Sequence, residues 1–296
     1  MNKRRIDILI VFFLSLVPTC VKFVFYPLYP GSDDAFIHAR IASNIVAGLG
    51  WGINAHEVVN ISTAPLYTIL LSLIAWLTPN YFLMAMIFSC ICSAIAIVVT
   101  YLIVSRLTTH NTARVFATIV AAFNVHLWRW NGTLMETMLA VALTLVVFYQ
   151  CIRSTENPTI PRIFWLGIIQ AAAVLVRPEL LLLPFSTILY FRLNNPRRLY
   201  MVIGTLASAM AIGLLPWITF SLLYFHSILP TTYYAKASGL HLLNPMVIKG
   251  AAVTLATSYL PVIVALLACL IFLPRLEVKQ RSLLVRRVLP FHCFPP

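Results

Sequence analysis

The sequence predicts an all-α, polytopic membrane protein with about eight transmembrane helices and an amphipathic, juxtamembrane helical first outer loop. Of its 296 residues, 61% are hydrophobic and only 10% are charged, whereas about a quarter of the residues of a soluble domain are charged. Its mean hydropathy is +0.92. The Lys and Arg residues lie in short clusters between apolar runs, as in the cytoplasmic loops of membrane proteins. The net charge of +13 therefore reflects topology, and we expect no nucleic-acid partner.

The predicted spans follow from the lengths of the apolar runs, because a helix needs about 20 apolar residues to cross a bilayer. They are 7–26, 81–104, 113–127, 133–151, 163–176, 180–191, 200–225 and 250–273. The fifth and sixth are short and flank Pro178, which breaks a helix. We expect residues 1–273 to form one transmembrane module with 27–80 as its first outer loop, and 274–296 to form a basic cytoplasmic tail.

The run at 66–77 decides the topology of the whole chain. It is shorter than a usual span, follows Pro65 and ends at Thr78-Pro79. If it crossed the membrane, the polar segments around Glu136 and Arg177 would face the cytoplasm. If it lies in the outer interface, the cytoplasmic segments are 1–6, 105–112, 152–162, 192–199 and 274–296, which with their edges hold most of the basic residues. The positive-inside rule favours this second topology.

In this topology the scarce carboxylates gather on one side of the membrane. Most of the eight acidic residues then face the outer side, beside a few cations. The carboxylates are Asp33, Asp34, Glu57, Glu136 and Glu179, and the cations are Arg40, Arg129, Arg177, Lys236 and Lys249. Because carboxylates at membrane depth are costly unless they are paired or hydrated, this grouping predicts a functional site.

The first outer loop opens with a predicted amphipathic helix. Ser32 or Asp33 can cap its N-terminus, and Gly48 or Gly50 can end it. Isoleucines recur on one face at helical spacing, at positions 37, 41 and 45. The pattern indicates a helix that lies along the membrane surface.

Polar residues on the same helix indicate more than capping. A cap needs one carboxylate, whereas Asp33 and Asp34 are adjacent and are followed within two turns by His38 and Arg40. We therefore predict that Asp33 and Asp34 belong to a site.

Two further segments each leave a structural and a functional interpretation open. Glu136 lies near the start of a predicted helix, where it either favours the helix N-terminus or projects into an outer cavity. Arg177 and Glu179 flank Pro178 and either form a surface ion pair or serve a ligand. An Arg suits a phosphate, because its planar guanidinium binds oxyanions with two parallel hydrogen bonds.

The segment at 229–239, LPTTYYAKASG, follows the longest predicted span. Tyr233 and Tyr234 are either interfacial belt residues or aromatic partners for a sugar. Lys236 provides another cation on the outer side.

Four motifs in register resemble one known group of enzymes. The chain reads DDAFIHARIASNIVAGLGWGINAHEVVNISTAPL, GTLMET, VRPEL and LPTTYYAK. GT-C glycosyltransferases akin to bacterial terminal arabinofuranosyltransferases have a similar first outer loop, then GLET, RPEG and PNTYYAK. The match covers about residues 30–240, and it is the order of all four motifs that makes it specific. Protein mannosyltransferases and the aminoarabinose transferases of lipid A are more distant relatives.

The resemblance implies a polyprenyl-phosphate-linked sugar as donor and an envelope glycan or lipid as acceptor. It places the chain in the bacterial inner membrane, multi-pass, with a cytoplasmic N-terminus and an active site that faces the periplasm. Asp33 or Asp34 would be the general base, and the transfer would invert the anomeric carbon.

The other site residues are assigned through the same resemblance. Arg177, Lys236 and Arg40 would hold the departing phosphate, and Glu136 and Glu179 would bind sugar hydroxyls or orient those cations. His38, Tyr233 and Tyr234 would complete the substrate-binding set. Some relatives hold a divalent cation, for which Asp33, Asp34 and Glu136 are the candidate ligands.

The chain also departs from its relatives. It has AHEVVN, MET and RPEL where the relatives have PGE.V.G, LET and RPEG, and no further span follows 250–273. It could therefore be a minimal version of the enzyme or an inactive truncated remnant. A lipid-linked sugar flippase or transporter is a further alternative, but a transporter typically has internal repeats and a site near the midplane. Neither is visible here.

Overall fold

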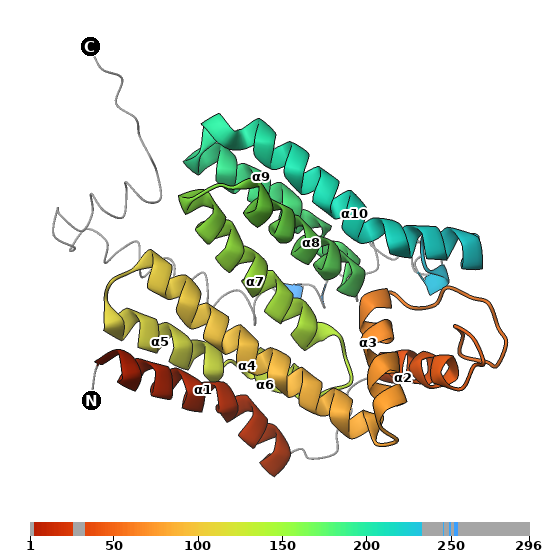
Figure 1. Cartoon of the computed structure of the whole chain (residues 1–296). Helices are drawn as coiled ribbons and strands as arrows, with labels where there is room; N and C mark the ends of the chain where they lie inside the picture. The colour runs from red at the N-terminus through yellow and green to blue at the C-terminus, as the bar shows by residue number, and fades with distance from the viewer. Residues whose placement is uncertain (1–2, 26–32, 233–244, 246–248, 250–251, 254–296) are drawn as a thin grey trace. The chain divides into compact units, whose positions relative to one another are not determined.

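The computed structural model describes residues 3–25, 33–232, 245, 249 and 252–253 (Figure 1). Within these residues the chain is helical and has no strand, which confirms the all-α prediction for this part. The predicted span 250–273 and the tail 274–296 fall outside it, apart from residues 252 and 253. Residues up to Thr232 form one compact unit.

Ten α-helices and two 3-10 turns make up the described chain. They are α1 (Lys3–Phe25), α2 (Asp33–Val46), α3 (Pro65–Leu77), α4 (Tyr81–Leu107), α5 (Asn111–Ala122), α6 (Val125–Trp130), α7 (Thr137–Glu156), α8 (Ile160–Val176), η1 (Pro178–Leu181), α9 (Leu182–Asn194), η2 (Pro196–Arg198) and α10 (Leu199–Phe225).

Two predicted spans differ clearly from the helices of the structure, whereas the others in the described residues differ by a few residues at their ends. The run 113–127 is not one helix: the Asn124 side chain accepts hydrogen bonds from the backbone N–H groups of His126 and Leu127 and starts α6 anew, as an N-cap does. The helix predicted from residue 133 begins at Thr137, because Gly132 has φ +62° and the segment before Thr137 turns. Both differences come from polar or glycine residues inside apolar runs.

Helix length supports fewer spans than the sequence predicts. Within the described residues, three helices are long and apolar enough to cross a bilayer: Tyr81–Leu107, Thr137–Glu156 and Pro196–Phe225. The apolar stretches Leu9–Phe25, Pro65–Leu77 and Ile160–Val176 are shorter. The count of about eight spans therefore stays a prediction.

The helices after α3 alternate in direction between two ends of the unit. Arg106 near the end of α4 pairs with Glu156 at the end of α7, so α4 and α7 run in the same direction while α5 and α6 return between them. Ser89, early in α4, donates a hydrogen bond to the carbonyl of Trp130 at the end of α6 over 3.4 Å. We name the end that holds Trp130 the loop end.

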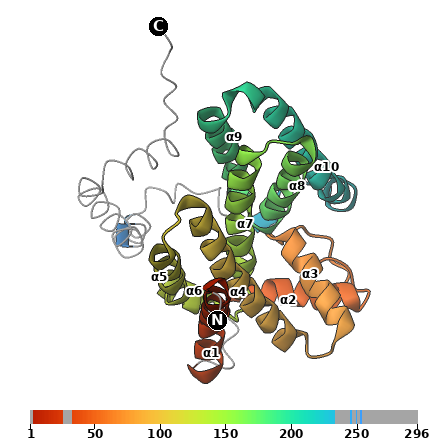
Figure 2. The same ribbon diagram turned by 60° about the vertical axis from the view of Figure 1, so that its left-hand side comes forward.

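Helix α3 begins and ends near the loop end. α2 and α3 pack together beside the start of α4 (Figures 1 and 2). Ala64, which precedes α3, and Ala85, which follows it, belong to one buried cluster with Tyr67 and Leu134. At about 1.5 Å per residue α3 is about 20 Å long, short of the hydrocarbon thickness of about 30 Å. The interfacial position of α3 stays a prediction.

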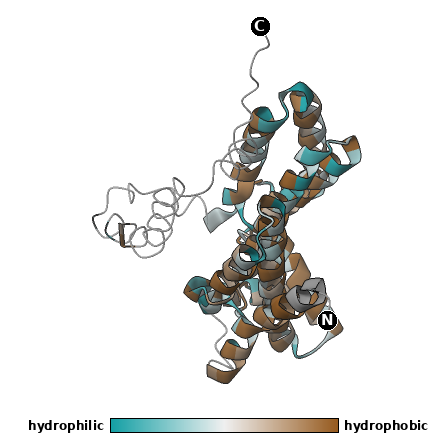
Figure 3. Ribbon diagram, turned by 90° about the vertical axis from the view of Figure 1, so that its left-hand side faces the viewer, coloured by the Kyte–Doolittle hydropathy of each residue, from teal (hydrophilic) through white to brown (hydrophobic). Residues whose placement is uncertain are grey.

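The outward surface of the helices suits a lipid environment. Apolar residues predominate along the helices in Figure 3. Large apolar side chains such as Trp76, Leu182 and Leu223 are more than 70% exposed. In a soluble monomer, extended apolar surface of this kind would promote aggregation.

Helices α8 and α10 approach closely at two glycines. A Cβ atom on Gly167 would lie 2.6 Å from Cβ of Ala209, and a Cβ on Gly213 would lie 2.6 Å from Cβ of Ala171. Such contacts are typical of membrane helices, whose interfaces use small residues to bring backbones together.

The variant Gly213→Ala should therefore destabilise the protein, and Gly204→Ala on the same helix is its matched control. Around Gly204 a Cβ would meet nothing within 4 Å, so alanine there should stabilise the helix by about 1 kcal/mol. Thermal unfolding in detergent should show a lower midpoint for Gly213→Ala and an unchanged or higher one for Gly204→Ala. Equal midpoints would contradict the close packing of α8 and α10.

Candidate active site

The predicted amphipathic helix is α2, which begins at Asp33 and ends at Val46. Gly48 and Gly50 follow it with φ of +72° and +95°, and such values favour glycine. Ala35, Ala39, Ile41 and Ala42 are buried, whereas Asp34 and Arg40 are exposed. The prediction of a helix with one apolar face is confirmed.

Arg40 is turned toward the loop after α2. Its Nε donates a hydrogen bond to the carbonyl of Ile53 over 3.3 Å. Asn44 donates to the carbonyls of Gly52 and Ile53 over 2.7 and 3.0 Å. The structure thus places Arg40 in a contact that holds the loop, and it does not bring Arg40 together with Arg177.

His38 is buried on the inner face of α2. Its Nδ1 lies 2.9 Å from Oγ1 of Thr68 and 3.4 Å from Oγ of Ser62. The ring of Tyr67 stands edge-on to it, with ring centroids 5.7 Å apart. Burial lowers the pKa of His38 from 6.5 to about 4, while the negative charge of Asp34 acts in the opposite direction. His38 is therefore neutral near pH 7.

Glu136 lies at the centre of the site. It occupies the N-cap position of α7 but makes no capping hydrogen bond, and its side chain is only 6% exposed. Its Oε1 lies 3.4 Å from Nε of Arg177, and its Oε2 lies 3.9 Å from Nε2 of His38. Of the two interpretations left open by the sequence, the structure favours a side chain that projects into the interior.

Opposing effects act on the Glu136 carboxyl group. Burial raises its pKa, the Arg177 charge lowers it, and the charges of Glu179 and Asp34 raise it. A buried carboxylate needs a compensating partner, and Arg177 is the cation that faces it within the described residues.

Arg177 joins the buried site to the surface. It has the extended backbone expected before a proline, with φ −149° and ψ 119°, and Pro178 then starts η1. Its side chain is 39% exposed and also lies 3.8 Å from Glu179, which is 68% exposed. The predicted Arg177–Glu179 pair is therefore present, but the contact of Arg177 with Glu136 is shorter.

The structure thus brings three predicted site residues into one row: His38, Glu136 and Arg177. They come from α2, the turn before α7 and the junction of α8 with η1. Asp34, one turn before His38 on α2, is near enough for its charge to act on His38 and Glu136. Sequence analysis missed Ser62, Tyr67 and Thr68, which surround His38. A buried hydroxyl group has no distinct signal in an apolar run, and the only hint was the segment STAPLYT next to a predicted interfacial helix.

The structure does not test some of the predicted site assignments. Tyr233, Tyr234 and Lys236 lie outside the described residues. Within the described part of the chain, no group of three or more His, Cys, Asp and Glu side chains lies close enough to hold a metal ion. A divalent cation on Asp33, Asp34 and Glu136 stays a prediction from the sequence.

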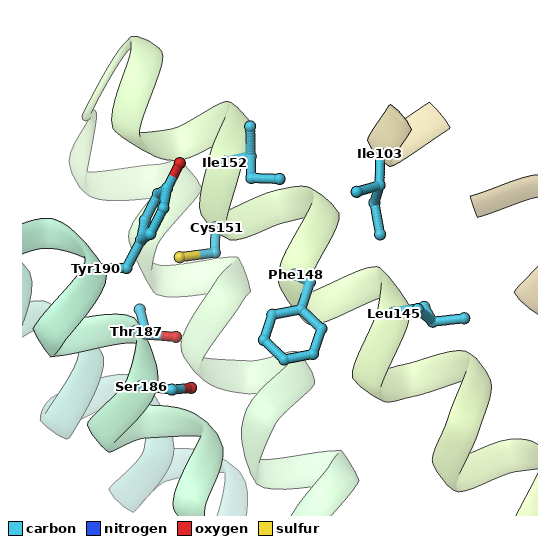
Figure 4. Close-up of a pocket in the computed structure, with 8 residues that line it drawn as sticks. All are labelled: Ile103, Leu145, Phe148, Cys151, Ile152, Ser186, Thr187 and Tyr190. Carbon is cyan, nitrogen blue, oxygen red and sulfur yellow. The ribbon is translucent and has the colours of Figure 1, made fainter. Parts of the chain in front are cut away.

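An apolar pocket of about 490 Å³ lies elsewhere, between α4, α7 and α9 (Figure 4). Its lining residues are Ile103, Leu145, Phe148, Cys151, Ile152, Ser186, Thr187 and Tyr190. None of them was predicted as a site residue, and Ile103 and Ile152 lie toward the helix ends that carry Arg106 and Glu156. The pocket is separate from the row around Glu136.

An all-helical chain with apolar outer surfaces and a charged row at one end fits a membrane enzyme. The family described as dolichyl-phosphate-mannose-protein mannosyltransferase matches residues 62–225, more than half of the chain. The chain belongs to this family of GT-C membrane glycosyltransferases, which use a polyprenyl-phosphate sugar donor. The predicted membership in the GT-C superfamily is confirmed. No curated protein and no solved structure matches the chain significantly.

The buried His38 gives a testable dependence of stability on pH. Because its pKa is about 4 in the folded protein and 6.5 in an exposed histidine, the unfolded chain binds more protons between these values. The free energy of unfolding should therefore fall as the pH is lowered from 6.5 toward 4. At pH 5 the contribution of His38 to this loss is about 2 kcal/mol.

Thermal unfolding of wild type and His38→Gln in detergent at pH 7 and pH 5 checks this. The raised pKa of Glu136 increases the free energy of unfolding as the pH falls, and it does so in both proteins. The difference between wild type and His38→Gln therefore isolates the contribution of His38. The midpoint of wild type should fall more than that of His38→Gln. The exposed His126 provides a control, because His126→Gln should behave as wild type. Equal falls in wild type and His38→Gln would show that His38 is not buried as a neutral side chain.

Proposed function

We propose that this chain transfers a sugar from a polyprenyl phosphate to an envelope glycan or lipid on the outer face of a bacterial inner membrane. The observation that carries the proposal is the row in which Arg177 meets the buried Glu136 and His38, next to the exposed Asp34. Family membership supports the donor class and the reaction type. The sugar is a hexose, as the family name implies, or a pentose, as the motif resemblance implies.

In this proposal an aspartate at the start of α2 is the general base. Asp34 is exposed, and its charge acts on both His38 and Glu136, so it lies where an acceptor can reach it beside the row. It takes the proton of an acceptor hydroxyl while the hydroxyl oxygen bonds to the anomeric carbon. Asp33, the preceding residue, is the other candidate for this role.

Arg177 is the proposed ligand of the departing phosphate. The bond between the anomeric carbon and the phosphate oxygen breaks on the face opposite the attacking hydroxyl, so the configuration inverts and the lipid phosphate keeps the electron pair. A guanidinium stabilises the charge that develops there. Glu136 and Glu179 both approach Nε of Arg177, and the partial exposure of the side chain leaves it open to a ligand.

The family match begins at residue 62, after α2. The assignment of the base therefore rests on the first-loop motif and on the packing of α2 against the helices that the match does include. His38, from α2, contacts Thr68 in α3 and approaches Glu136 before α7.

Replacing the proposed bases should abolish transfer. In membranes supplied with labelled polyprenyl-phosphate mannose or pentose, Asp34→Asn or Asp33→Asn should lower the rate at least a hundredfold, since general bases contribute about 10²–10⁴. Glu57→Gln is the matched control: Glu57 is a carboxylate of the same loop that binds Asn54, so its variant should retain the rate. Transfer at the wild-type rate by the double variant Asp33→Asn/Asp34→Asn would remove the proposed base.

We further propose that the N-terminus is cytoplasmic and that the loop end faces outward. Reporter fusions after Asn80 and after Leu107 test this, because the two positions lie at the two ends of α4. The first fusion should report the outer side and the second the cytoplasm. The reverse result would mean that residues 66–77 cross the membrane and that the site faces inward.

A further inference from the structure

Two buried polar atoms at the loop end have no hydrogen-bond partner within the described residues. They are Oε2 of Glu136 and Oη of Tyr67, and both side chains are buried, with Tyr67 only 1% exposed. A buried polar atom without a partner costs free energy. Oε2 of Glu136 lies next to the His38 ring and therefore points to a polar group that occupies this place in the working protein.

The distance between Oε2 of Glu136 and Nε2 of His38 fits one bridging oxygen atom. Nε2 of His38 and Oε2 of Glu136 are 3.9 Å apart, too far for a direct hydrogen bond. An oxygen at about 2.8 Å from both atoms would see them at an angle of about 90°. A hydroxyl group has the chemistry that this position requires, because it donates one hydrogen bond to a carboxylate and accepts another from an N–H group. Since Oε2 is buried, the side chains around it must shift to admit the hydroxyl group.

The hydroxyl oxygen can accept a hydrogen bond from His38 only if Nε2 carries the ring proton. Which nitrogen carries the proton depends on the hydrogen bond that the other nitrogen, Nδ1, makes. Nδ1 lies 2.9 Å from Oγ1 of Thr68, and Oγ of Ser62 lies 2.8 Å from the same oxygen. Ser62 can donate to Thr68 while Thr68 donates to Nδ1. The Thr68 hydroxyl also lies 3.2 Å from the carbonyl of Ala64, but Nδ1 at 2.9 Å is the closer acceptor. In the opposite tautomer, Nε2 would direct a lone pair at a carboxylate, which is repulsive.

The charged groups around the ring agree with this arrangement. Nε of Arg177 lies 3.4 Å from Oε1 of Glu136. This contact favours the ionised carboxylate and leaves Oε2 as a hydrogen-bond acceptor. Glu179 and Asp34 are the other charged groups near the row, and both side chains are exposed to solvent. The buried part of the row thus has one donor, Nε2–H, and one acceptor, Oε2, side by side.

We propose that Thr68 is a positioning residue that fixes the tautomer of His38, so that His38 and Glu136 together bind one hydroxyl group of the donor sugar. The identity of the hydroxyl as that of a sugar rests on the proposed function, whereas the tautomer does not. This role orients the sugar next to Arg177 and Asp34, and it explains why a histidine and a glutamate are buried at the loop end.

The tautomer can be measured without any substrate. The full chain with ¹⁵N-labelled histidine is purified in detergent, and the resonances of His38 are assigned by their loss in His38→Gln. At pH 7 wild type and Thr68→Ser should show a neutral ring with the proton on Nε2. Thr68→Val has the same shape without the hydroxyl group. It should shift part of the population to the Nδ1–H tautomer, because only Glu136 and the more distant Ser62 then favour the proton on Nε2. A wild-type ring protonated on Nδ1, or identical spectra of wild type and Thr68→Val, would overturn the positioning role.

Lipid binding then tests the hydroxyl site on the same proteins. The probes are polyprenyl-phosphate mannose and polyprenyl monophosphate, which lacks the sugar. Thr68→Val should bind the sugar-bearing lipid about tenfold more weakly than wild type and the sugar-free lipid equally well, and Thr68→Ser should match wild type for both. A loss for both lipids, or equal binding of both lipids by wild type, would overturn the sugar-hydroxyl site.

The two measurements separate the proposal from the proposed function. If wild type binds neither lipid, the proposed function fails, and the NMR result still decides whether Thr68 positions His38. If both lipids bind as expected but no sugar is transferred, the hydroxyl site holds and the transferase reaction is wrong. Thermal midpoints of the Thr68 variants confirm that both are folded.

Discussion

The buried carboxylate of Glu136 is the constraint on which the rest of the site depends. A carboxylate removed from water must be balanced by a cation or by hydrogen bonds, and Arg177 provides that cation from the end of α8. The contact ties the turn before α7 to the break after α8. Because Arg177 is 39% exposed, solvent screens part of the interaction, which leaves the guanidinium available to a ligand.

The breaks between helices allow polar groups to gather inside the helical unit. Gly132 turns the chain before α7 and Pro178 ends α8, so Glu136 and Arg177 stand at helix ends, next to backbone that is not fully paired within a helix. Irregular backbone in a membrane protein occurs where it is buried in protein or lines a cavity. The close contact of α8 with α10 at Gly167 and Gly213 then fixes the position of the α8 terminus.

Family membership and local geometry contribute different parts of the functional argument. The family match covers α3 to α10 and defines a polyprenyl-phosphate-dependent glycosyltransferase. The helix with Asp33 and Asp34 lies before the matched region, and its relation to the reaction depends on the contacts of His38. Ser62 and Thr68 belong to the matched region, and their hydroxyl groups contact His38, which precedes it. They therefore link α2 to the part of the chain that defines the family.

The sequence by itself determined the all-α class, the amphipathic helix that begins at Asp33, and the pairing of Arg177 with carboxylates at one end. These features depend on hydrophobic periodicity and on charge placement, which are properties of local sequence. Only the tertiary structure decided that Asn124 interrupts a predicted span, that Arg40 turns to a loop carbonyl, and that Thr68 meets His38. Such contacts join side chains far apart in the chain, and hydropathy cannot reveal them because it averages over neighbours and carries no information about which side chains face each other.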